Sequence, residues 1–253
     1  MGGPRAIEGV VTQLQALLDD LAAEPPDQVA GRQPFLATYL RTTRAVGDAV
    51  RQGSFEDPAW VEEWDVVFAE LYVDALTAYQ EGRPAPRPWR LAFEASADVH
   101  PLGHVLLGVN AHINYDLPQA LLAVVPPQAF ADPGVLVSRR RDHERIDDVL
   151  AERVSAEDGE LEQVSDGGRT LLDRAMTPVN RRAARRFLRE ARIKVWHNTT
   201  ALHEARLRGA ADYAERLRDL DTLSSAKVSD LLRPGPVLVR LALVGFGVTL
   251  PPA

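Results

Sequence analysis

The residues best suited to chemistry in this sequence lie in the stretch 100–118, HPLGHVLLGVNAHINYDLP, which holds half of the histidines in the chain. Helical spacing makes His112 and Asp116 neighbours on one helix surface, because they are four residues apart. Asn110 and Asn114 form a second pair with the same spacing. Both pairs border an apolar stripe, and buried polar groups are costly unless they are hydrogen-bonded or bound to metal. We therefore expect a buried polar site here, with these four residues as the catalytic candidates.

A second stretch, 139–150, reads RRRDHERIDDVL and repeats the spacing with His143 and Asp147. Two facing helices that each present an inward His–Asp pair would place two imidazoles and two carboxylates around one point, as in metal sites of helical bundles. The chain has no cysteine, so a metal would have to be held by imidazole, carboxylate, amide or water ligands. Such ligands suit zinc, iron or manganese. The candidate metal ligands are His112, Asp116, His143 and Asp147.

Each pair also has a simpler interpretation. Asp116 precedes Leu117-Pro118 and could serve only to cap the helix that Pro118 begins. His143 could be an exposed histidine beside arginines. Either His–Asp pair could be a hydrogen-bonded pair in which the carboxylate only orients the imidazole, since the motif lacks the specificity of His-Glu-x-x-His.

A long helix expected over 178–209 adds the remaining candidates. Asn198 falls near the centre of its apolar face and should need a buried partner. Trp196 falls instead on the face that carries arginines, which predicts an Arg–Trp stack, a basic rim for an anionic substrate or an ordinary solvated face. The candidate substrate-binding residues are His104, Trp196, Arg192 and Asn198.

The composition limits the class of protein. A formal net charge of −7 argues against a general nucleic-acid binder, whose footprint is basic. There is no Gly-x-Gly-x-x-Gly, Walker-type lysine loop or Gly-x-Ser-x-Gly elbow. The start of the chain lacks the apolar segment of a secretory signal, from which we expect a cytoplasmic protein. The apolar C-terminal run is interrupted by Arg240 and is too short to span a bilayer comfortably, so we expect no membrane span.

The elements that must position these residues are helical. Aromatic residues are 6% of the chain while Ala and Leu are plentiful, which favours helices over strands. We predict an all-α, single-domain multi-helix bundle over 1–253, with a buried central motif helix and an apolar tail, 236–253, packed on it. The expected helices are 7–22, 34–50, 58–81, 118–125, 139–154, 178–209 and 210–220, with a Pro-rich connector at 82–90 and a surface excursion at 155–168. In the helix over 58–81, Glu70 and Asp74 are either solvated carboxylates or supplementary ligands.

The stretch GVNAHINYDLPQAL, residues 108–121, resembles the DUF5995 family, an uncharacterised bacterial family abundant in actinobacteria. The family core reads Gly-Met-Asn-Ala-His-Ile-Asn-x-Asp-Leu-Pro, and the chain matches it with Val109 in place of Met. The resemblance extends to FEDPAWVEEWDVVFAELYVDAL and to ARIKVWHNTTAL, and so covers most of the chain. The two His-x-x-x-Asp spacings more loosely resemble the helical zinc-dependent phospholipase C and P1 nuclease group. The N-terminal Trp ligand and the full histidine set of that group are missing here.

Three functions are compatible with these residues. The first is a metal-dependent hydrolase, in which a divalent ion lowers the pKa of bound water and the asparagines orient substrate. The second is a metal-free enzyme in which His112, oriented by Asp116, is the general acid/base on a small organic substrate such as a secondary metabolite. The third is a helical binding or scaffold protein, with the C-terminal tail as its partner surface. A homo-oligomer is compatible with each.

Overall fold

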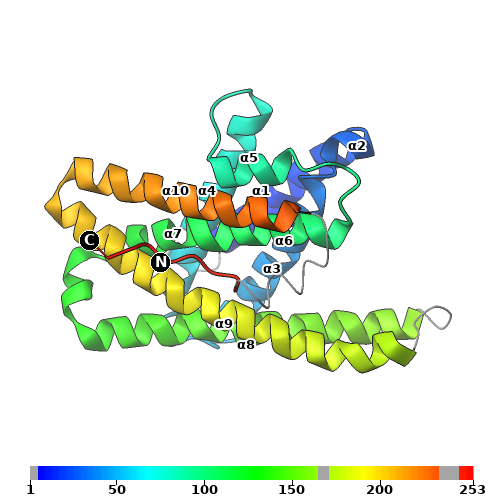
Figure 1. Cartoon of the computed structure of the whole chain (residues 1–253). Coiled ribbons are helices and arrows are strands. Elements are labelled where there is room, and N and C mark those ends of the chain that lie inside the picture. Colours follow the sequence, from blue (N-terminus) through cyan, green and yellow to red (C-terminus); the bar gives the residue numbers. More distant parts are fainter. Residues whose placement is uncertain (1–4, 165–170, 234–244, 253) are drawn as a thin grey trace.

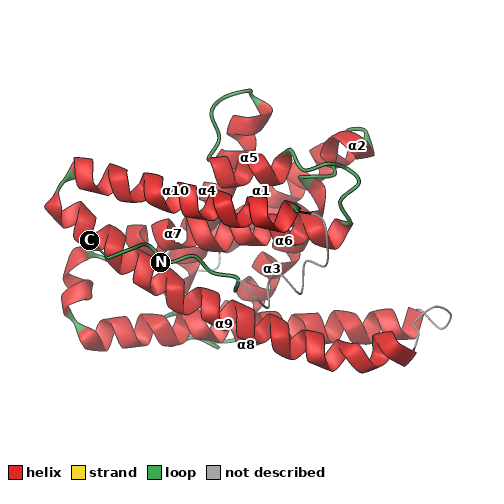
Figure 2. Ribbon diagram, viewed as in Figure 1, coloured by secondary structure: helices red, strands yellow, loops and turns green. Residues whose placement is uncertain are grey.

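The computed structural model describes residues 5–164, 171–233 and 245–252, with the side chains at 5, 147 and 150–189 left out. All the regular elements of this part of the chain are helical, as the sequence predicts (Figures 1 and 2). They are α1 (Arg5–Ala22), α2 (Pro26–Val29), α3 (Gln33–Arg51), α4 (Pro58–Gln80), α5 (Arg87–Phe93), α6 (Pro101–Ala111), the π-helical η1 (His112–Asp116), α7 (Leu117–Val124), the 3₁₀-helical η2 (Pro127–Ala131), α8 (Pro133–Val164), α9 (Leu171–Arg208) and α10 (Ala210–Leu232). None of the described helices is long and apolar enough to cross a membrane.

The elements α6, η1 and α7 follow one another as the central rod of the bundle. The helices packed against this rod are α3, α4, α5, α9 and α10. Figure 1 shows α10 along one side of the rod and the long antiparallel pair α8 and α9 along the other. Residues that are distant in sequence therefore meet at the rod, which carries the candidate site.

Burial of the rod differs from the expected one-sided pattern. Val105, Val109 and Ile113, which helical spacing places in the apolar stripe, are only half-buried. Asn110 and His112, expected at its borders, are almost fully buried at 0% and 3% exposure. The reason is that helices surround the rod, so that its polar side chains also face protein.

Three expected boundaries are corrected by the structure. α5 begins inside the Pro-rich connector, because Pro88 lies in the first turn of the helix, where its missing N–H costs no hydrogen bond. α8 continues through 155–164, which we expected to be a surface excursion. α10 extends to Leu232, twelve residues past the end expected at 220.

The start of α4 is fixed by two aspartates. The carboxylate of Asp57 accepts from the N–H of Trp60 at 3.1 Å, as an N-cap does. Asp142 of α8 is fully buried and accepts from the N–H groups of Glu56 and Asp57 at 2.7 and 2.8 Å. These bonds tie the entry of α4 to α8 and so fix the aromatic face of α4 against the rod.

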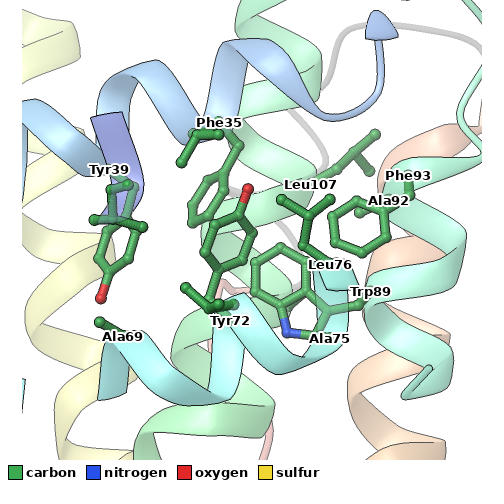
Figure 3. Packing of buried hydrophobic residues seen from close by; sticks show 14 of the residues in the cluster. Phe35, Tyr39, Ala69, Tyr72, Ala75, Leu76, Trp89, Ala92, Phe93 and Leu107 are labelled. Atoms are coloured by element: carbon green, nitrogen blue, oxygen red, sulfur yellow. The ribbon is translucent and has the colours of Figure 1, made fainter. Parts of the chain in front are cut away.

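An aromatic cluster fills the space between α3, α4, α5 and the rod (Figure 3). The rings of Phe35 and Tyr72 meet edge to face with centroids 5.1 Å apart, and Trp89 lies 4.9 Å from Tyr72. Gly108 lets α3 approach the rod, because a Cβ at this position would lie 2.4 Å from the ring of Phe35. The cluster thereby reaches the next turn of the rod, where His112 lies.

Candidate functional site

The centre of the candidate site is a buried histidine–aspartate dyad. The Nδ1 atom of His112 lies 2.8 Å from Oδ2 of Asp116, and the indole N–H of Trp89 donates to the same oxygen at 2.7 Å. Both members of the dyad are at most 3% exposed. Because the Asp116 carboxylate accepts a hydrogen bond from Nδ1 of His112, we assign the neutral His112 tautomer with its proton on Nδ1. The other ring nitrogen, Nε2, then carries a lone pair and can accept a hydrogen bond. Among the described residues, Nε2 has no hydrogen-bond partner.

The dyad lies in the π-helical turn η1, where the N–H of Leu117 bonds to the carbonyl of His112, five residues earlier. Pro118 follows directly and has no N–H with which to continue an α-helical ladder toward Asn114. Single π turns of this kind are frequent at functional sites. The sequence does not signal the π turn, although its proline marks the place.

Aromatic rings enclose the imidazole. The ring of Phe68 stacks on His112 with centroids 3.5 Å apart and planes 8° apart, and Tyr39 meets it edge-on at 4.6 Å. Trp89 and Phe35 each lie 5.7 Å away. Burial among these rings lowers the pKa of His112, while the Asp116 carboxylate opposes that shift. Burial likewise raises the pKa of Asp116, and the hydrogen bonds from His112 and Trp89 oppose that shift.

A second carboxyl group, which the sequence pattern did not indicate, lies near this site. Asp65 of α4 is 4% exposed, and burial followed by the charge of Glu62 raises its pKa to about 7. Burial, followed by the charge of Asp65 and a smaller effect of Asp116, raises the pKa of the Tyr39 hydroxyl, so both carboxyl groups are close enough to act on this residue. The available signal was the position of Asp65 between Trp64 and Phe68, where a carboxylate on an aromatic helix face is unusual.

His143 belongs to a separate polar cluster. It is fully buried on α8, its Nδ1 accepts from the indole N–H of Trp196 at 2.9 Å, and the Arg192 guanidinium donates to its backbone carbonyl. Burial, and then the charge of Arg192, lower the pKa of His143 well below the usual range. The interpretation of His143 as an exposed residue is therefore wrong, and so is the placement of Trp196 on a solvated face. The stacked arginine is Arg140 of α8, 5.5 Å from the Trp196 ring.

Phe68 and Trp64 connect the two histidine clusters. Phe68 stacks on His112, Trp64 stacks on Phe68 at 5.8 Å, and the ring of His143 meets Trp64 edge-on at 5.4 Å. The side chain of Asp147 lies outside the described residues. In the part of the chain that is described, no three His, Asp or Glu side chains come together as a metal-binding group. Glu70 and Asp74 are exposed, as solvated helix carboxylates are.

The three candidate asparagines bind the C-terminal segment. The amide N–H groups of Asn110 and Asn114 donate to the carbonyl of Phe246 at 3.2 and 3.1 Å. Asn198, which we predicted to need a buried partner, donates to the carbonyl of Val248 at 3.0 Å, and this prediction is confirmed. Their predicted role in orienting substrate stays a prediction.

The other two histidines of the motif, His104 and His100, differ in their exposure to solvent. His104 is buried on α6 two turns before the dyad, and burial lowers its pKa while the backbone of Val99 opposes the shift. His100 is exposed, and its ring nitrogen accepts from the N–H of Leu102 at 3.2 Å, so it caps α6. His100 is therefore the N-cap of α6. Asp116 precedes α7, but its side chain makes no cap hydrogen bond to that helix, so the interpretation of Asp116 as only a helix cap is wrong.

Residues 7–234 match the family of unknown function DUF5995. The chain belongs to this family. The match includes the dyad, Asp65, the His143 cluster and all three asparagines, and ends ahead of the segment 245–252. No curated protein and no solved structure gives a significant match.

Proposed function

We propose that this protein is an enzyme that uses the His112–Asp116 dyad, without a metal, as a general acid/base on a small organic substrate. The observation that carries the proposal is the asymmetry of the imidazole. One nitrogen is held by a carboxylate, and the other is buried without a hydrogen-bond partner among the described residues. A base that is oriented by a second group and has one reactive atom left is the arrangement that proton-transfer catalysis needs.

The protonation states fit such a role. The lowered pKa of His112 keeps its imidazole neutral at pH 7, so that Nε2 is a base. The pKa of Asp65, about 7, keeps a fraction of this carboxyl group protonated at the same pH, so that it is an acid. Titratable groups whose environments shift their pKa values in this way are the ones that divide acid and base roles in enzymes. Tyr39, whose ring meets His112 edge-on at 4.6 Å, would donate a hydrogen bond to the substrate.

The aromatic rings around His112 indicate the kind of substrate. Phe68, Tyr39, Phe35 and Trp89 present aromatic surface to His112, which suits a small and largely apolar molecule with one acidic C–H or O–H group. Because the dyad is at most 3% exposed, substrate entry requires side chains around His112 to move.

The test is solvent exchange catalysed by the full-length protein. A mixture of small organic acids, ketones and aromatic metabolites is incubated with the protein in D₂O, with and without a chelator, and deuterium uptake is followed by mass spectrometry. We expect uptake or conversion that survives the chelator and is lost in His112→Gln. His100→Gln, at the exposed cap, is the matched control. Turnover that persists in His112→Gln would contradict the proposal.

A metal-dependent hydrolase is the second candidate. A carboxylate that holds Nδ1 of a histidine is also the usual support of a metal ligand, which then coordinates through Nε2. In this arrangement Asp116 supports His112 rather than binding the ion beside it. A stoichiometric transition metal in protein purified without a histidine tag, lost on His112→Ala, would favour the hydrolase over the metal-free enzyme.

A further inference from the structure

The C-terminal segment 246–250 is bound along the bundle as an extended chain (Figure 1, red). Phe246, Val248 and Leu250 are buried, at 4%, 8% and 1% exposure, whereas Thr249 is exposed. Gly247 between them faces α9. Burial of alternate side chains is the pattern of a β-strand that lies on a surface. No strand is present among the described residues, however, so the backbone of this segment must find its partners elsewhere.

Two asparagines supply the bonds that a neighbouring strand would make. Asn114 donates to the carbonyl of Phe246 at 3.1 Å and accepts from the N–H of Val248 at 3.0 Å. Asn198 donates to the carbonyl of Val248 at 3.0 Å and accepts from the N–H of Leu250 at 2.8 Å. Each amide side chain thus pairs with the carbonyl of one residue and the N–H of the second residue after it, as in β-strand addition.

Cationic and imidazole donors complete the main-chain contacts. Lys227 donates to the carbonyl of Gly245 at 2.8 Å, Lys194 to that of Gly247 at 3.1 Å, and His197 to that of Leu250 at 3.1 Å. All of these bonds go to the backbone of the segment. They would be made equally well with any extended peptide in the same register.

The fit at Gly247 restricts which peptide can bind. A Cβ at this position would lie 3.0 Å from the Cα atom of Ala191 and 2.7 Å from Cδ of Lys194. Lys194 can move, but the backbone of α9 cannot. The pattern that fits is therefore apolar, glycine, apolar, any residue, apolar.

We propose that the groove formed by η1, α9 and α10 is a peptide-recognition site, and that residues 246–250 of a second copy of this chain replace the chain's own segment in it. The groove residues lie inside the family match, and the segment lies outside it. The sequence that fits the groove is the chain's own FGVTL, and exchange of an identical segment between two copies keeps every bond, which makes it a low-cost route to a dimer.

The first experiment uses full-length Gly247→Val, whose own segment no longer fits, and a fluorescent peptide of residues 245–252. We expect the peptide to bind this variant, and to bind it roughly tenfold to a hundredfold more weakly when Asn114→Ala is added, because two hydrogen bonds are lost. A peptide with Val at the Gly247 position is the control and should not bind. Thr249→Ala, at the exposed position, should leave the protein's own segment in place and the peptide unbound.

The second experiment mixes two full-length variants. Gly247→Val has an intact groove and a segment that does not fit it. The double variant Asn114→Ala, Asn198→Ala has a damaged groove and an intact segment. We expect a heterodimer by light scattering only in the mixture. Peptide binding without a heterodimer would overturn the second copy as the occupant, and a folded Gly247→Val that binds no peptide would overturn the site itself. If Gly247→Val and Leu250→Asp both lose their helical circular dichroism, the segment is part of the core and the proposal is wrong.

Discussion

His112 and Asp116 are joined at 2.8 Å inside the bundle, and the same carboxylate oxygen is held by Trp89. The consequence is that the dyad has one orientation. Burial in the aromatic cluster lowers the pKa of His112 and keeps the ring neutral, although the carboxylate opposes that shift. The second ring nitrogen is buried and has no hydrogen-bond partner among the described residues.

Replacing Asp116 with Asn should lower the pKa of His112 below its value in the parent protein. The carboxylate opposes the effect of burial on His112, and the neutral amide would still accept the Nδ1 proton without supplying a charge. Titration of the imidazole signals by NMR measures the shift. Asp74→Asn, at an exposed position of α4, is the control and should leave this pKa unchanged. An unchanged or raised His112 pKa in Asp116→Asn would show that the carboxylate does not act on the ring as described.

The same titration predicts how stability depends on pH. The pKa of His112 is lower in the folded protein than in the unfolded chain, where it is about 6.5, so the unfolded chain binds more protons at acidic pH. The contribution of His112 to the free energy of unfolding is therefore complete above about pH 6.5 and is lost as the pH falls. In Asp116→Asn the loss of stability should extend to more acidic pH, because the pKa of His112 in the folded variant is lower still. Urea unfolding at a series of pH values measures this.

Replacing Asp65 with Asn should stabilise the protein at pH 8 more than at pH 5. Burial raises the folded pKa of Asp65 to about 7, so the folded protein holds a proton that the unfolded chain releases near pH 4. The carboxyl group therefore costs increasing stability as the pH rises from about 4 to about 7, and above that pH the cost levels off at about 4 kcal/mol. The free energy of unfolding from urea denaturation at both pH values checks this. An equal effect at pH 5 and pH 8 would contradict the raised pKa.

Gly108→Ala should destabilise the protein by about 1–3 kcal/mol, because the new methyl group would overlap the buried ring of Phe35. Gly9→Ala is the matched control, since that glycine is at an exposed position of α1 with nothing within 4 Å of the added atom. There the better helix propensity of alanine should stabilise by about 0.5–1 kcal/mol. Thermal unfolding of the two variants should move the midpoint in opposite directions. Equal effects would mean that α3 does not pack closely against the rod.

Asp142→Ala should cost about 2–4 kcal/mol, because the N–H groups of Glu56 and Asp57 would lose a buried acceptor. Glu144→Ala, two residues along the same helix and exposed, should have little effect. Denaturant unfolding compares the two variants. Hydrogen exchange at the start of α4 should also accelerate in Asp142→Ala alone, and protection that stays intact there would rule out the proposed link between α8 and α4.

Local sequence pattern was sufficient for much of the fold. The helical class, the central position of the motif and the pairing of His112 with Asp116 all follow from spacing within a few residues along one helix. The need of Asn198 for a buried partner follows in the same way from its place on an apolar face. These features could be predicted because residues four apart on a helix are neighbours whatever surrounds them.

The tertiary structure decided the rest, because it depends on which helices meet. No spacing could show that Asp65 from α4 lies near the dyad, or that Trp196 and Arg192 belong to His143. Nor could it show that Asn114 and Asn198, 84 positions apart in the sequence, bind one extended segment. The helical wheel assumed one buried face, whereas helices pack on several sides of the rod, so the chemistry of each polar residue is set by the helix that covers it.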